Sequence, residues 1–147
     1  LADVRGKAET ERLAIARGNV LMAPETLRAA RAGNLKKGDL RAVAELAGVM
    51  AAKRTSELIP LCHPLPLTQV DVVLAFEDSL PGVTLTATAR TTGRTGVEME
   101  AMTAVSVAAL AVYDMIKGID RRARISDVRL IEKHGGRSGD LVLEPGP

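Results

Sequence analysis

Three prolines within ten residues, Leu58-Ile-Pro-Leu-Cys-His-Pro-Leu-Pro-Leu67, set the strongest limit on how this chain can fold. Proline fixes the backbone φ angle and has no N–H to donate, so this segment can be neither the middle of a helix nor a central strand. Most of its other residues are apolar, which is unusual for a solvent-exposed turn. We therefore expect a stiff loop that holds His63 still beside Cys62. A buried connector with a hydrogen-bonded histidine would explain the same pattern.

The composition narrows the class of protein. The 147 residues fit a single domain over residues 1–147, and Phe76 and Tyr113 are its only aromatic residues, so the core must be aliphatic. A net charge of +2 is too balanced for bulk nucleic-acid binding, and single-stranded nucleic acid is usually held by aromatic stacking. We therefore expect no nucleic-acid partner.

The numbers of cysteines and histidines and the lengths of the apolar runs exclude further classes of protein and site. One cysteine rules out an internal disulfide and suits a reducing compartment, so we expect a cytoplasmic protein. One cysteine and two histidines are too few for a Cys/His zinc site within one chain, and no metal site is expected. The longest apolar run, Ala104–Tyr113, is too short to span a bilayer, so no membrane partner is expected.

Hydrophobic periodicity and turn residues predict the elements. Helices are expected from Pro24 to Gly33, from the N-cap Asp39 to about Thr55, and from Val97 to about Ile119. Strands are expected over Glu11–Met22, Val70–Phe76, Val83–Thr91, Val128–Glu132 and Leu141–Leu143. This order predicts an α+β fold with a mostly antiparallel sheet and helices packed on one face.

The two longer helices carry further patterns. The second has an apolar stripe at nearly helical spacing, formed by Leu40, Val43, Leu46, Ala47 and Met50. Thr95-Gly-Val-Glu98 matches a capping box at the start of the third. This third helix is rich in alanine, and a surface helix of a monomer would show a wider polar face. We expect a second helix, of this or another subunit, to pack on it.

Candidates for chemistry lie at both ends of the third helix. Asp114 and Lys117 are three residues apart and share a face. A surface ion pair explains this spacing, and so does a carboxylate and an amine that tune each other for proton transfer. Glu98 and Glu100 begin the helix, where acidic side chains suit the helix dipole. Capping accounts for Glu98 but leaves Glu100 without a structural role.

Basic residues gather where the chain changes direction. Each is explained as a solvated charge, but together they would suit a pocket for an anionic ligand. They are Lys36, Lys37, Lys53, Arg54, Arg90, Arg94, Lys133 and Arg137.

Taken together, these segments resemble the molybdenum cofactor biosynthesis protein C family, the cyclic pyranopterin monophosphate synthases. The most specific matches are Leu-Ile-Pro-Leu-Cys-His-Pro at 58–64 and Thr-Gly-Val-Glu-Met-Glu-Ala at 95–101. Other matches cover almost the whole chain in order: Asp3-Val, Lys7–Thr10, Lys37–Asp39, Ala51–Thr55, Tyr113–Met115 and Gly135–Asp140. His134 departs from the pattern, since a small polar residue is expected there.

The resemblance implies a ferredoxin-like α+β fold and a homo-hexamer, a trimer of dimers, with sites between subunits. It implies a lyase that converts 3′,8-cyclo-7,8-dihydro-GTP, made by a radical enzyme, into cyclic pyranopterin monophosphate and releases pyrophosphate. No cofactor is expected to be required, and whether Mg²⁺ assists at the triphosphate is left open.

The resemblance also assigns residues. Asp114 is implied as the catalytic acid or base, with Lys117 beside it and Lys37 at a further site position. Substrate contacts are implied for Leu61, Cys62, His63, Met99, Glu100 and Lys53, with Glu98, Arg90 and Lys133 as further candidates.

Helix geometry adds one expectation. Glu100 and Asp114 are fourteen residues apart, so a continuous helix separates them by roughly 21 Å. Both cannot serve the same reacting atoms from one chain, and we expect each site to combine residues of two subunits. The alternative function is a ferredoxin-like metabolite-binding regulatory domain without catalysis, which would not need the paired acid and amine.

Overall fold

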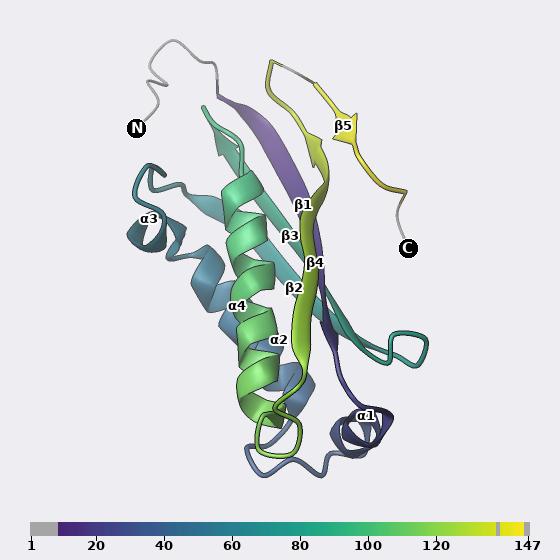
Figure 1. Ribbon diagram of the computed structural model, residues 1–147. Helices are drawn as coiled ribbons and strands as arrows, with labels where there is room; N and C mark the ends of the chain where they lie inside the picture. Colours follow the sequence, from purple (N-terminus) through teal and green to yellow (C-terminus); the bar gives the residue numbers. More distant parts are fainter. Residues whose placement is uncertain (1–8, 138, 146–147) are drawn as a thin grey trace.

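The computed structural model describes residues 9–137 and 139–145. Residues 3–8 of the first matched segment, and Ser138 of the last, lie outside the described residues. The strands are β1 (Thr10–Leu21), β2 (Leu67–Glu77), β3 (Gly82–Gly93), β4 (Arg124–His134) and β5 (Leu141–Val142). The helices are α1 (Pro24–Arg31), α2 (Leu40–Ala52), α3 (Thr55–Leu58) and α4 (Glu98–Ile116) (Figure 1).

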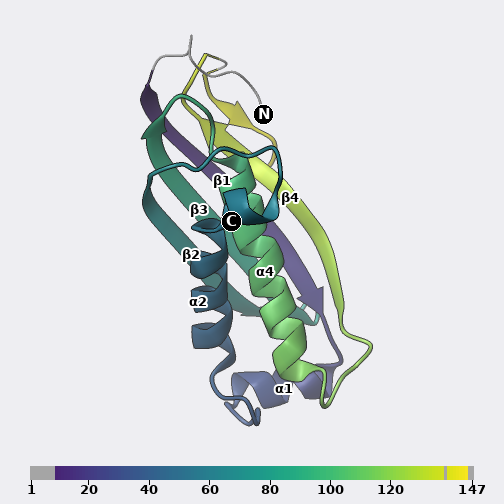
Figure 2. The same ribbon diagram turned by 90° about the vertical axis from the view of Figure 1, so that its left-hand side faces the viewer.

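The strands form one antiparallel sheet in the order β2-β3-β1-β4-β5. The chain passes from β1 through α2 to β2, and from β3 through α4 to β4. The two long helices lie side by side on the same face of the sheet, and α1 lies at one end of the molecule (Figure 2). This confirms the α+β, ferredoxin-like fold expected from the sequence.

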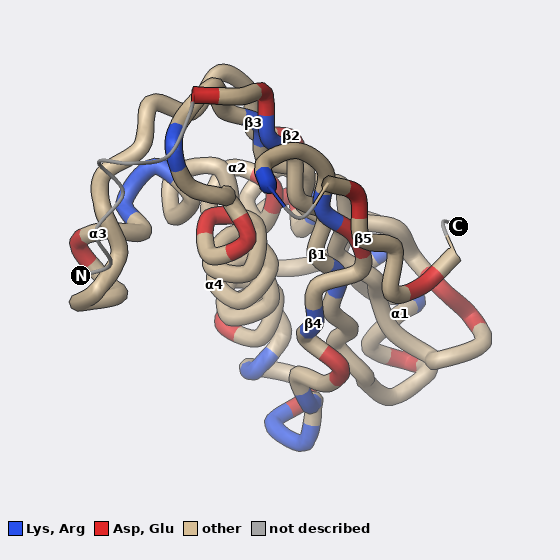
Figure 3. The backbone as a smooth tube through the Cα atoms, turned by 90° about the horizontal axis from the view of Figure 1, so that it is seen from above, with Lys and Arg blue, Asp and Glu red and all other residues tan. Residues whose placement is uncertain are grey.

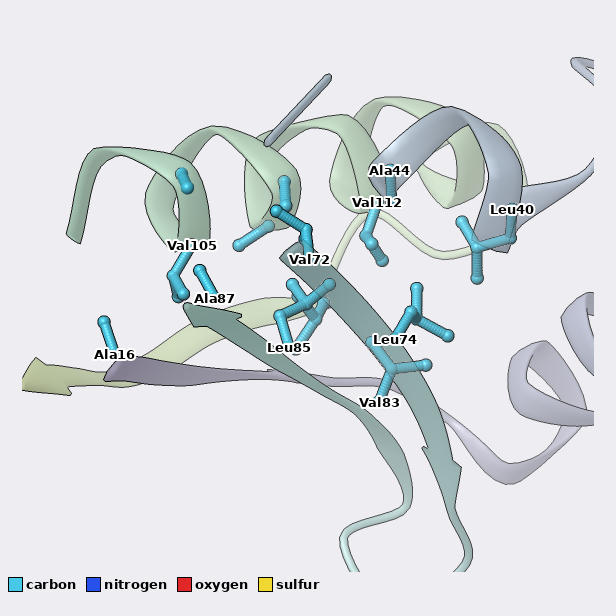
Figure 4. Packing of buried hydrophobic residues seen from close by; sticks show 14 of the residues in the cluster. Ala16, Leu40, Ala44, Val72, Leu74, Val83, Leu85, Ala87, Val105 and Val112 are labelled. Atoms are coloured by element: carbon cyan, nitrogen blue, oxygen red, sulfur yellow. The ribbon is translucent and has the colours of Figure 1, made fainter. Parts of the chain in front are cut away.

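The core fills the space between the sheet and the two helices (Figure 4). On β3, the predicted alternation holds, because Val83, Leu85, Ala87 and Ala89 are fully buried. Four alanines of α4 are fully buried between the sheet and α2: Ala101, Ala104, Ala108 and Ala109. The second helix expected beside α4 is therefore α2 of the same chain.

At Gly48 the two helices approach each other closely. A Cβ atom added there would lie 3.0 Å from the carbonyl oxygen of Ala104 and 3.0 Å from a methyl group of Val72. Only glycine leaves both contacts undisturbed, because it has no Cβ atom. This contact fixes the distance between α2, α4 and the sheet.

The predicted apolar stripe of α2 is wrong for its larger members. Leu40 is buried, but Val43, Leu46 and Met50 are 41%, 60% and 48% exposed. The buried face consists instead mostly of small residues, since a helix that approaches α4 so closely has no room for bulky ones; its members are Leu40, Ala44, Gly48, Ala51 and Ala52. The larger side chains are left on the outer surface.

Two helices end earlier than predicted. The helix that begins after Asp39 ends at Ala52, and the separate helix α3 follows it. The long helix ends at Ile116, where the backbone N–H of Ile119 donates to the carbonyl of Ile116 in a tighter turn.

The predicted capping box is also wrong. The N-cap of α4 is Val97, without a side-chain cap. Thr95 lies too far before the first turn to act as its cap. The side chain of Glu98 instead lies against Gly96 and pairs with Lys133.

By length and composition, α4 could cross a membrane, although its apolar run had suggested otherwise. However, 56% of its most apolar stretch is buried inside the protein. Its place as the central helix of the core accounts for this composition.

The Gly48 contact predicts a stability change. Gly48→Val should lower the free energy of unfolding by about 2 kcal/mol, because the added atoms must displace the Ala104 backbone or Val72. Ala42→Val, on the exposed face of α2, is the control and should change it by less than about 0.7 kcal/mol. Denaturant unfolding measures both, and equal losses in the two variants would contradict the close packing.

Candidate active site

The residues predicted from the sequence fall into two groups at opposite ends of α4. One group surrounds Asp114 near its C-terminal end. The other surrounds Glu100 in its first turn.

Asp114 lies between two lysines. The Nζ atom of Lys37 donates to both carboxylate oxygens of Asp114 at 3.0 Å and to its main-chain oxygen at 3.3 Å. The Nζ atom of Lys117 lies 3.0 Å from the same carboxylate. These hydrogen bonds, that of Lys37 foremost, hold the pKa of Asp114 below its ordinary value. In the free protein the group is thus an ionised proton acceptor flanked by two ammonium donors.

A cavity of about 550 Å³ opens beside this cluster. Its wall combines the two lysines with apolar side chains that include Leu35 and Ile119, and with the ring of Tyr113. This size and mixed lining are typical of sites for small molecules. The cavity lies between the loop after α1, which carries Lys37, and the loop after α4.

The proline-rich loop forms the second group, at the other end of the molecule. The N–H of Cys62 donates to the carbonyl of Ile59, and the buried hydroxyl of Thr91 donates to the carbonyl of Pro66 at 2.7 Å. The loop is thus held at both ends. Residues 59–62 form a turn, and both Cys62 and His63 line one small cavity.

This second cavity has a volume of about 140 Å³. It brings together most of the remaining predicted residues: Leu61, Cys62, His63, Glu98, Met99 and Glu100. Glu100 is only 4% exposed, and burial, with the charge of Glu98 adding to it, raises its pKa. Burial and the neighbouring Glu100 also raise the pKa of the Cys62 thiol, which disfavours a nucleophilic thiolate.

Basic residues surround this end of α4. The Nζ atom of Lys133 lies 3.6 Å from the carboxylate of Glu98, while Lys53 is exposed just after α2. Arg90 lies apart from them, in a cavity of about 310 Å³ that it shares with Arg12 and His134. The view onto this end shows the acidic first turn of α4 with Lys and Arg residues on the neighbouring segments (Figure 3).

The comparison with known proteins decides the family. A family model described as the MoaC family matches residues 1–136. The chain belongs to the MoaC family. The cyclic pyranopterin monophosphate synthase of Dinoroseobacter shibae is 58% identical over 144 residues, covering 98% of this chain and 91% of that protein. Proteins of the same name from Methylobacterium sp. and Heliobacterium modesticaldum are 57% and 55% identical, each also covered over 91% of its length; they match 99% and 98% of this chain.

Some residues of this MoaC family member were not predicted as site residues. Tyr113 and Ile119 line the larger cavity, and Arg12 and His134 line the cavity of Arg90. Arg12 lies within a strand and forms no local motif, so spacing gave no signal for it. Among residues 9–137 and 139–145, no three His, Cys, Asp or Glu side chains gather closely enough to hold a metal ion.

The lysine pair predicts a measurable shift. Lys37→Met should raise the pKa of Asp114 towards its ordinary value, because it removes the strongest hydrogen bond to the carboxylate. A carboxylate whose pKa is lowered by folding stabilises the protein above its ordinary pKa, and this stabilisation is lost as the pH falls through the pKa of the folded state. The stability of the variant should therefore depend less on pH in this acidic range. Titration of the carboxyl carbon by NMR measures the shift. Lys36→Met is the control, and an equal rise in both variants would contradict the assignment.

Proposed function

We propose that this chain is a cyclic pyranopterin monophosphate synthase of molybdenum cofactor biosynthesis. It converts 3′,8-cyclo-7,8-dihydro-GTP, supplied by a radical enzyme, into cyclic pyranopterin monophosphate and releases pyrophosphate, as a lyase. The observation that carries the proposal is the cluster of Lys37, Asp114 and Lys117 beside a cavity of nucleotide size, in a member of the MoaC family.

The chemistry of the cluster suits this reaction. A cyclic monophosphate forms from a triphosphate when a substrate hydroxyl attacks the α-phosphorus and the bond to pyrophosphate breaks. The ionised Asp114 can accept a proton, and the ammonium groups of Lys37 and Lys117 can donate one and stabilise the charge that develops on the leaving group. We assign these three residues the catalytic role.

The other end of α4 offers different chemistry. The raised pKa of Glu100 favours its neutral form, which can donate a hydrogen bond to a ring nitrogen or carbonyl of the substrate. We assign substrate contacts to the loop residues Leu61, Cys62 and His63 and to Met99. Lys53, Arg90 and Lys133, with Glu98 as the partner of Lys133, would hold the phosphates. The proposal includes no resident cofactor, and any Mg²⁺ would enter with the triphosphate.

The two groups require a second chain if they form one site. They are separated by roughly 21 Å along α4. Apolar side chains are exposed on the outer faces of both long helices, with Leu110 on α4 57% exposed and Leu46 on α2 60% exposed. We propose that a second copy covers this surface with its own helices reversed, so that a two-fold axis forms two equal sites. Three such dimers would make the hexamer.

Turnover tests the function. The chain, incubated with 3′,8-cyclo-7,8-dihydro-GTP, should release pyrophosphate and form cyclic pyranopterin monophosphate. Asp114→Asn should lower kcat by about a hundredfold or more while substrate binding persists, because the amide keeps the shape but cannot exchange a proton. Binding without product in the original chain would favour a regulatory domain instead. A nearly unchanged kcat in the variant would refute the role of Asp114.

Mixed assemblies test the shared site. Asp114→Asn chains and His63→Ala chains, inactive by themselves, should regain activity when dissociated and reassembled together, because some sites then receive two intact halves. Verified mixed assemblies without activity would rule out sharing.

A further inference from the structure

Asp120 lies in the loop between α4 and β4 and bonds across the molecule. Its Oδ2 atom accepts hydrogen bonds from the backbone N–H of Ala23 at 2.8 Å and from the hydroxyl of Thr26 at 2.9 Å. Its Oδ1 atom accepts one from the N–H of Arg122 at 3.2 Å. The first two partners are about a hundred residues away in the chain, so this carboxylate ties two distant segments together.

These bonds replace the local cap of α1. The N-cap of that helix is Ala23, whose side chain cannot accept a hydrogen bond. In a capping box the side chain at the third helical position accepts the N–H of the N-cap residue. Here that position is Thr26, which donates to Asp120 instead, and Asp120 takes the N–H of Ala23. A negative charge at this end of the helix is also favoured by the helix dipole. The same contacts, that from Ala23 foremost, lower the pKa of Asp120.

Asp120 is itself fixed to α4. Its backbone N–H donates to the carbonyl of Ile116 at 2.9 Å, and Tyr113 holds the same loop through a hydrogen bond from its hydroxyl to the carbonyl of Arg121 at 3.0 Å. The carboxylate therefore has a constant position relative to Asp114 and Lys117, which lie on the last turn and the C-cap of that helix.

Helix α1 connects the anchored segment to the loop that holds Lys37. The helix has eight residues, and its far end is closed by hydrogen bonds from Gly33 and Asn34 to the carbonyls of Ala30 and Ala29. Lys37 follows three residues later and reaches back to Asp114. A short closed path thus runs from Asp114 along α4 to Asp120, through α1, and back to Asp114.

We propose that Asp120 is a positioning residue that holds Lys37 against Asp114 by anchoring the start of α1 to the end of α4. It acts through α1 and does not touch the substrate. The consequence for turnover rests on the proposed function, whereas the consequence for Lys37 itself does not.

The chemical reactivity of Lys37 tests this without substrate. Asp120→Ala should let an amine-selective acylating reagent modify Lys37 several-fold faster, as measured by mass spectrometry, because the ammonium is released from Asp114. Lys36, in the same loop, should keep its rate. Asp120→Asn retains an acceptor oxygen and should behave nearly as the original chain, and Asp71→Ala, an exposed aspartate on β2, is the matched control. An unchanged rate at Lys37, or an equal rise at Lys36 and Lys37, would overturn the proposal.

A double-mutant cycle gives the second test. Asp120→Ala should lower kcat/KM roughly tenfold in the original chain, since small misplacements of catalytic groups cost rate steeply. In a Lys37→Ala background the same Asp120→Ala substitution should lower kcat/KM by less than about twofold, because Lys37, through which Asp120 acts, is no longer present. Equal losses in both backgrounds would mean a merely structural role and would overturn the proposal. If the original chain forms no product, the proposed function fails, and the acylation rates alone decide the role of Asp120.

Discussion

The contact between α2 and α4 at Gly48 determines how the rest of the molecule is arranged. With no side chain there, the two helices come close enough for Ala104 and Val72 to touch the same point, and α4 is enclosed by the sheet on one side and α2 on the other. Small residues fill this contact, so the larger apolar residues of α2 face outwards. The same feature thus produces a tight core and an exposed apolar surface.

A helix buried along most of its length can offer chemistry mainly at its ends. At one end, Asp114 is exposed and its pKa is lowered by two lysines; at the other, Glu100 is buried and its pKa is raised. Two carboxyl groups whose pKa values are pushed in opposite directions are suited to opposite roles, one as proton acceptor and one as donor. On the same chain they lie too far apart to serve one reacting centre. The proposed pairing of two chains brings them together.

The sequence predicted what depends on local pattern. The alternation of β3, the cap at Asp39 and the pair of Asp114 with Lys117 are all short-range features, and all are confirmed. It failed where a distant contact decides. The outward side of α2 depends on how closely α4 approaches. The contact of Lys37 with Asp114 spans 77 residues, so spacing alone gave no signal for it, and only the family resemblance placed Lys37 at the site. The N-terminus of α1 is capped by Asp120, which is about a hundred residues away in the sequence. A search for capping residues near Ala23 could not have found it.

The central claim, that one site is built from the two ends of α4 in different chains, can be measured by cross-linking. Cys62 is the only cysteine and lies at one end, and Lys36→Cys places a second thiol at the other. The two ends of α4 beside which these positions lie are roughly 21 Å apart within a chain, measured from Glu100 to Asp114. A bismaleimide shorter than half that distance should join Cys62 of one chain to the introduced thiol of another, giving covalent dimers identified by their linked peptides. If both thiols react with a monofunctional maleimide and no link between chains forms, the two ends do not meet and the shared site is wrong.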